Sequence, residues 1–335
     1  MSPPTSPHPS ASPHHPNTSR ARSLRSASVE ASPRSPRQIF NEIVDQIPQI
    51  KEFTELIYED IDPDDGSLLC LSLVEDKRIE RRCVRVNFNA HTRVLRIKVM
   101  PTRLHDVHQR WATAAMATWA LNGLLNQDEV DLLCGSVGST FTGFAGNYRG
   151  SSKEPDYSFC PNSSAFPSLV IEAGWAESFP HLRNDKDLWM DGCPSVELVL
   201  LIRWTKISGN RVKGMVEVWR RNGAGGLSVT EMPIFPRPVP QPASELVQFT
   251  KGQLFGPMVI AGQDPSTVLS LDVARLRVMA EEVMTMRMGL TPAQVVLPAK
   301  EECGLLRKHL ALTSADTQCD NEDVVVLYAS LAQTA

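Results

Sequence analysis

Residues 196–202 (VELVLLI) are apolar at all but one position, which limits the folds open to this chain. A strand with one face in water alternates apolar and polar side chains, whereas a strand that is covered on both faces does not. The segment therefore predicts an interior strand of a sheet with helices on both faces. Two helices are predicted near it. Residues 104–125 repeat apolar side chains at steps of three and four, enough for about six turns, and a second helix runs from near Ser178 to Gly192.

Shorter β patterns surround this interior strand. They predict strands at residues 157–160, 169–172, 211–219 and 227–234, with a strand or hairpin at 137–148. After a Pro-rich connector, residues 269–288 have helical spacing and are expected to pack back on the sheet. The predicted fold class is α/β (α+β), a mixed sheet flanked by helices.

The first hundred residues predict an N-terminal α+β extension of this sheet. Helical spacing begins near Ser35 or Pro36 and continues to residue 57, with an interruption or kink at Pro48. Strands are predicted at residues 68–73, 83–88 and 94–99. The last two read as a hairpin, because residues 89–92 make a short polar link between them.

These patterns divide the chain into five regions. Residues 1–37 contain eight Pro and ten Ser and almost no large apolar side chain, so we expect a disordered tail. An accessory α+β layer follows at 38–102, and the sheet core occupies 103–235. The Pro-rich connector with its packing helix spans 236–290, and a C-terminal tail with little pattern spans 291–335.

The composition excludes several classes of protein. No run of eighteen apolar residues occurs, so a membrane span is not expected. Seven cysteines are scattered without a CxxC or Cys/His cluster, which argues against a zinc site and favours reduced thiols in an intracellular protein. Five Arg and one Glu give residues 1–37 a net charge of +4, which leaves −8 for the remainder. Such a body binds nucleic acid poorly unless it has a local basic cleft.

Two acids near the ends of neighbouring predicted strands suggest chemistry. Asp156 follows Pro155 at the start of one short strand, and Glu172 ends an apolar strand after fifteen intervening residues. Carboxylates at adjacent strand ends can share Mg²⁺, which also binds water and substrate phosphate. The pair therefore suggests metal-dependent hydrolysis of phosphodiesters with help from a nearby lysine. Each acid alone is also compatible with a turn or strand-end carboxylate that the backbone satisfies.

This arrangement resembles the PD-(D/E)XK restriction-endonuclease-like superfamily, and within it a set of fungal proteins. The likeness covers roughly one third of the chain. The matching residues are Lys153, Pro155, Asp156, Glu172, Gly174, Trp175, Glu177, Ser178, Leu182, Asp185 and Trp189, with the apolar strand at 199–202. The resemblance implies a restriction-endonuclease-like mixed sheet and a Mg²⁺-dependent nuclease whose metal ligands are Asp156 and Glu172.

One position departs from the superfamily's pattern. The assisting lysine belongs two residues after Glu172, where this chain has Gly174. Lys186 on the following helix and Lys153, three residues before Asp156, are the candidates to replace it. Either lysine is equally compatible with a solvated surface charge.

Three functions stay open on these grounds. The first is a nuclease acting on nucleic acid, with catalytic residues Asp156, Glu172 and either Lys186 or Lys153. The second is a catalytically inactive recognition or scaffold module that keeps the fold after losing the usual lysine. The third is an unrelated α+β interaction protein that carries the motif by chance, since a fold does not by itself determine a function.

Overall fold

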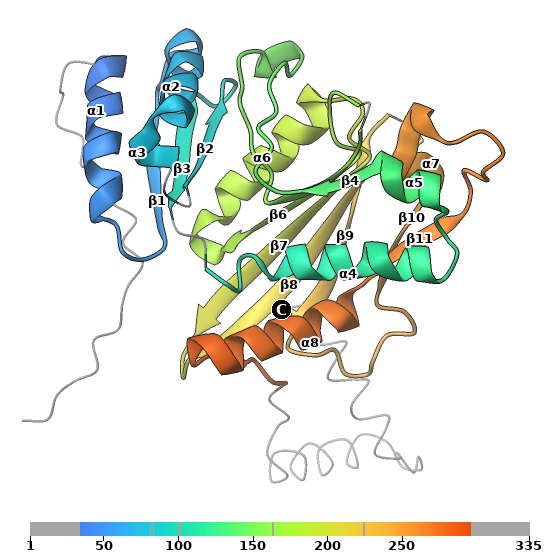
Figure 1. Ribbon diagram of the computed structural model, residues 1–335. Coiled ribbons are helices and arrows are strands. Elements are labelled where there is room, and N and C mark those ends of the chain that lie inside the picture. The colour runs from blue at the N-terminus through green and yellow to red at the C-terminus, as the bar shows by residue number, and fades with distance from the viewer. Residues whose placement is uncertain are drawn as a thin grey trace, which may run out of the picture.

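A seven-stranded mixed sheet forms the centre of the molecule (Figure 1). The computed structural model describes residues 34–295, apart from 81, 83, 100, 101, 163 and 224. The strands are β4 (Leu133–Ser136), β5 (Tyr157–Pro161), β6 (Leu169–Trp175), β7 (Leu198–Ile207), β8 (Arg211–Arg221), β9 (Leu227–Phe235) and β12 (Thr291–Pro292). β6 runs parallel to β7 and β12 runs parallel to β8, whereas the other pairs are antiparallel. The predicted mixed sheet is confirmed.

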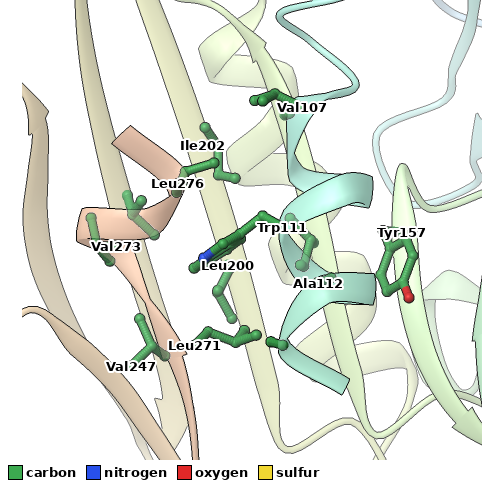
Figure 2. Packing of buried hydrophobic residues seen from close by; sticks show 14 of the residues in the cluster. Val107, Trp111, Ala112, Tyr157, Leu200, Ile202, Val247, Leu271, Val273 and Leu276 are labelled. Atoms are coloured by element: carbon green, nitrogen blue, oxygen red, sulfur yellow. The ribbon is translucent and has the colours of Figure 1, made fainter. Parts of the chain in front are cut away.

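β7 lies inside the sheet, between β6 and β8, as its apolar sequence predicts. Residues 198–202 are at most 1% exposed and alternate between two apolar clusters. One cluster includes residues of α4 (Val107–Leu121) and α8 (Val273–Val283), and the other includes residues of α6 (Phe179–Gly192). Figure 2 shows part of the first cluster, around Trp111 of α4. Helices therefore cover both faces of the sheet.

A second, smaller sheet forms an N-terminal layer, drawn in blue in Figure 1. Its three antiparallel strands have the order β1-β3-β2. The elements of this layer are α1 (Pro36–Gln46), η1 (Ile47–Gln49), β1 (Thr54–Tyr58), α2 (Pro63–Glu75), α3 (Lys77–Glu80), β2 (Val84–Asn89) and β3 (Val94–Val99). Ser35 and Gln38 form a capping box at the start of α1, and Pro36 is its first residue, as predicted. The predicted hairpin of β2 and β3 is also confirmed.

The two faces of this small sheet differ in polarity because side chains alternate along each strand. One face packs against α1 and α2 in an apolar cluster of its own. The other face pairs Arg85 with Lys98 and Asn87 with Arg96 across β2 and β3. We call these four residues the polar face. All four are buried, so the polar face lies against the rest of the protein and not in water.

Residues 68–73, predicted as a strand, lie in α2 instead. Asp62 caps this helix through its side chain. Leu69 and Leu73, four residues apart, are buried, whereas Leu68 is exposed. This is a helical burial pattern. The prediction was wrong because a short apolar run fits a buried helix as well as a strand.

The helical spacing predicted to reach residue 57 also ends earlier. The chain leaves η1 after Gln49, and β1 then pairs with β3. Pro48 is compatible with the start of the short 3₁₀ turn but not with a longer helix. Tertiary pairing then determines the strand that follows.

Two further predictions are corrected on the C-terminal side. Residues 137–148 are mostly irregular between β4 and η2 (Gly146–Tyr148), although Phe141 makes an isolated bridge with Lys153. The helix predicted at 269–288 begins later, because β11 (Val268–Asp272) first pairs with β10 (Leu246–Thr250). The remaining helices are α5 (Gln127–Leu132), η3 (Ala176–Ser178), α7 (Lys251–Phe255), η4 (Gly256–Met258) and the π-helix η5 (Met284–Met288).

The predicted tails at the two ends of the chain can be compared with the structure only in part. Pro36 and Arg37, placed in the predicted tail, belong to α1. Residues 1–33 of that tail and residues 296–335 lie outside the described residues. In the part of the chain that is described, no helix is long and apolar enough to cross a membrane.

Packing between α2 and β2 gives a test of this layer. A Cβ added at Gly66 would lie 2.2 Å from the ring of Phe88, which is 1% exposed and enclosed by its neighbours. We expect Gly66→Ala to lower the free energy of unfolding by about 2 kcal/mol, although alanine favours helices. Urea denaturation measures the change. Gly223→Ala is the control, because its added Cβ meets no atom of the described residues within 4 Å. Equal stability of the two variants would contradict this packing.

Candidate functional site

Asp156 and Glu172 are neighbours on two paired strands. Asp156 directly precedes β5, and the antiparallel register of β5 and β6 sets Tyr157 opposite Ile171, so Asp156 comes opposite Glu172. The backbone N–H of Ala173 donates a hydrogen bond of 2.8 Å to Asp156 Oδ2. Both acids are fully buried. The two sheet strands thus hold the carboxyl groups side by side and away from solvent.

Lys153 joins this pair of acids. Its Nζ lies 2.8 Å from Glu172 Oε1 and 3.4 Å from Oδ2 of Asp185 on α6. Two backbone hydrogen bonds to Phe141 fix the segment that carries it. Lys153 is only 1% exposed, so it is not a solvated surface charge.

Lys186, the other candidate cation, has different partners. Its ammonium group pairs with Asp187 and lies 4.3 Å from the centre of the Trp219 ring. The side chain of α6 that turns toward the acids is that of Asp185, one residue earlier. The structure therefore brings Lys153, and not Lys186, to Glu172.

Three cations of the polar face also reach these acids, and the sequence reasoning missed them. Lys98 Nζ lies 3.2 Å and 3.1 Å from the two oxygens of Asp156, and Arg85 pairs with the same carboxylate. Arg96 pairs with Asp185. The signal in the sequence was the alternation of charged and apolar residues in β2 and β3. It is also the pattern of a sheet face in water, so it could not reveal a buried partner.

His105, just before α4, completes the surroundings of Asp156. Its Nε2 lies 3.3 Å from Asp156 Oδ2, and its Nδ1 lies 3.1 Å from Asp106 Oδ1. Burial lowers the pKa of His105, but the two carboxylates outweigh burial and raise it above its ordinary value. Both oxygens of Asp156 are therefore occupied by groups that carry or can carry positive charge.

Burial has opposite outcomes for the two central acids. Burial alone raises the pKa of a carboxyl group, because it disfavours the charged form. At Asp156 the charges of Lys98, His105 and Arg85 outweigh burial and hold the pKa well below its usual range. At Glu172 burial prevails over its lysine partner, and the pKa is raised. Asp156 thus keeps a negative charge, and Glu172 takes up a proton more readily.

A divalent cation does not fit these residues as they are arranged here. Among the residues that the structure describes, no group of three or more His, Cys, Asp or Glu side chains could hold a metal ion. Trp189 Nε1 donates a hydrogen bond of 2.9 Å to Glu172 Oε1, and only Oε2 of that carboxylate lacks a partner. The protein's own cations occupy the place where a metal would meet Asp156.

A small cleft lies between the polar face and α6, beside this network. Its lining includes Asn87 and Arg96 of the polar face, Lys153, and His181 and Asp185 of α6. The cleft has a volume of about 20 Å³, which is room for about one water molecule. Asp156 and Glu172 are 0% exposed, so a nucleic acid cannot reach them in this arrangement.

Comparison with known proteins adds no relative. No family model matches the sequence, no curated protein matches it, and no solved structure matches the fold. The likeness to the PD-(D/E)XK superfamily therefore rests on the sequence motif alone.

His108 of α4, next to this site, predicts a pH dependence. It is fully buried, and burial lowers its pKa to about 4 although the nearby Asp156 opposes this shift. In the unfolded chain the pKa is about 6.5, so the unfolded state binds the proton more tightly. The stability contributed by the neutral ring is complete above pH 6.5 and is lost as the pH falls toward 4.

We expect His108 to lower the free energy of unfolding by about 2 kcal/mol when the pH falls from 7.5 to 5. The measurement is urea denaturation of wild type and His108→Leu at both pH values. The difference between the two proteins isolates His108, because the other titrating groups remain in both. Parallel pH profiles for the two proteins would show that His108 does not supply this dependence.

Proposed function

We propose that this protein is a metal-dependent nuclease of the PD-(D/E)XK type, with Asp156, Glu172 and Lys153 as its catalytic set. The observation that carries the proposal is the 2.8 Å contact between Lys153 Nζ and the Glu172 carboxylate, next to Asp156 on the paired strand. Asp, Glu and Lys are the three residue types that the resemblance requires. Lys153 supplies the charge that is missing at Gly174.

Packing explains why the lysine comes from another segment. A Cβ at Gly174 would lie 2.8 Å from Ser178 Oγ and 2.9 Å from Leu182 Cδ1, at the start of α6. A lysine there would require the side chains of Ser178 and Leu182 to shift. Lys153, held by its backbone bridge to Phe141, reaches Glu172 from outside the large sheet.

The order of elements supports the same superfamily. The residues that match its pattern fall on consecutive elements: Asp156 just before β5, Glu172 in β6, the turn η3, then α6 and the parallel strand β7. Helices cover both faces of this sheet. A restriction-endonuclease-like fold is thus part of the proposal.

Each residue of the set has a defined task in this proposal. Asp156 and Glu172 would hold Mg²⁺, which when bound supplies a polarised water and stabilises the leaving oxygen. Lys153 stabilises negative charge that develops on the phosphate. The Ala173 N–H and the Trp189 indole orient the two carboxylates. Arg85 and Lys98 must first leave Asp156, so the arrangement described above is the closed form.

A second candidate function is a catalytically inactive recognition or scaffold module. It is favoured by the surroundings of Asp156, where Arg85, Lys98 and His105 take the place of a metal ion. A buried carboxylate can serve structure alone when its charge is paired in this way. In this function the polar face never leaves the acids.

Cleavage assays on single-stranded and duplex DNA and RNA, with Mg²⁺ or Mn²⁺, test the first proposal. We expect weak cleavage by wild type and none by Asp156→Ala. Lys153→Met should reduce the rate by about a hundredfold or more, because it removes a charge-stabilising donor. Lys186→Met should keep most of the activity, since its ammonium pairs with Asp187. Circular dichroism verifies that each variant is folded.

Lys98→Met makes this test independent of closure. It removes one cation from Asp156, so we expect tighter Mn²⁺ binding in calorimetric titration than in wild type. Absence of both cleavage and Mn²⁺ binding in wild type and Lys98→Met would reject the nuclease and leave the inactive module. Cleavage that survives Asp156→Ala would place the chemistry elsewhere.

A further inference from the structure

The polar face has the composition of a surface that binds phosphates. Arg85, Asn87, Arg96 and Lys98 project from one side of the β2–β3 hairpin as two cross-strand pairs. Arginine, lysine and asparagine are among the side chains that contact the phosphates of nucleic acids. In this structure, however, the face contacts carboxylates.

Those carboxylates all belong to the segments around the candidate active site. Lys98 and Arg85 bind Asp156, and Arg96 binds Asp185. Arg85 Nε also lies 3.3 Å from Glu154 Oε1. The core thus presents acids to the polar face where a nucleic acid would present phosphates.

This interface leaves several polar atoms unsatisfied. Among the described residues, Asn87 Nδ2 and Arg96 Nη1 of the polar face find no hydrogen-bond partner, nor does Oε1 of Glu55 on the neighbouring strand β1. The Asn87 amide is fixed in orientation, because its Oδ1 accepts a hydrogen bond from the Glu154 N–H. A buried donor without a partner opposes burial. Closure is therefore less favourable than the number of ion pairs suggests.

The N-terminal layer also has the features of a unit with a core of its own. It has its own apolar cluster, distinct from the two clusters of the large sheet. Its backbone joins the core through the Phe88–Ser152 bridge, and the Ala90 N–H donates to Ser151 Oγ. A layer with its own core that is held by polar contacts can move as a unit.

We propose that the polar face binds the phosphodiester backbone of nucleic acid, and that the acids of the core occupy it in the closed form. This inference rests on the proposed nuclease function, since the bound strand would be the substrate of the same acids. Opening would free the cations for phosphate and Asp156 for a metal ion in one movement. Phosphates and carboxylates would then compete for the same three cations.

A reversible lock on the closed form tests this inference. The side chain of Ser152 lies close to the Cys70 thiol of α2, so Ser152→Cys brings two thiols close together across the interface. Copper-catalysed oxidation forms the crosslink, and mass spectrometry quantifies it. We expect the oxidised variant to bind a fluorescent single-stranded oligonucleotide at least tenfold more weakly than the reduced variant. Wild type under the same oxidant should not change.

Asp156→Asn tests the same inference by favouring the open form, and it does not depend on crosslinking. The substitution keeps the shape of the side chain, releases Lys98 and Arg85, and prevents cleavage during the measurement. We expect tighter oligonucleotide binding than in wild type. Three phosphate contacts predict a slope of log K against log salt of about −2 for a single strand. Glu129→Gln is the matched control, because it releases the buried Lys251 outside the polar face.

The outcomes separate this inference from the proposed function. Equal oligonucleotide binding by the oxidised and reduced variants would overturn it, as would equal affinity of Asp156→Asn and Glu129→Gln. Binding of inorganic phosphate without binding of the oligonucleotide would also overturn it. Cleavage by the locked protein would overturn it and leave the nuclease intact. Oligonucleotide binding in the open form without cleavage would support the polar face and reject the nuclease.

Discussion

The buried carboxylate of Asp156 is the group on which the rest of this structure depends. A carboxylate that is buried without a partner loses its hydration and is strongly destabilising. Lys98, Arg85 and His105 offset that loss, and two of these three side chains come from the N-terminal layer. Removal of one partner from a buried ion pair typically costs about 3–5 kcal/mol. The N-terminal layer and the core are thus coupled through charge.

The same coupling determines what the site can do. With the layer closed, Asp156 is neutralised by protein cations and cannot also bind a metal ion. With the layer open, the carboxylate and its former cations would both be free for other charged ligands. Phosphates could replace the carboxylates as partners of these cations, because both groups are negatively charged. An apolar interface could not bind a phosphate. A protein that keeps the closed form would be the inactive module, whereas a protein that also opens could act as the nuclease.

The sequence predicted those features that a local pattern determines. The apolar run in β7 predicted an interior strand, and the Ser-Pro start predicted α1. The spacing from Asp156 to Glu172 predicted neighbouring strands, and the register of β5 and β6 agrees with it, but Glu172 lies inside β6 (Leu169–Trp175) and not at its end. Local pattern could not decide between helix and strand for residues 68–73, because only contact with Phe88 and α1 settles that segment.

Long-range charge pairing was the part that the sequence could not supply. Arg85 and Asp156 are 71 residues apart, and Arg96 and Asp185 are 89 residues apart. Nothing in the alternation of β2 and β3 distinguishes a face in water from a face buried against acids. Lys153 was one of two candidates from the sequence, and its fully buried contact with Glu172 depends on the bridge to Phe141.

A double-mutant cycle on Lys98 and Asp156 tests the coupling between the layer and the core most directly. It compares the unfolding free energies of wild type, Lys98→Met, Asp156→Asn and the double variant. A buried, directly contacting pair predicts a coupling energy on the order of 2 kcal/mol. Additive effects, within about 0.5 kcal/mol, would mean that the N-terminal layer does not neutralise Asp156, and they would contradict the closed arrangement.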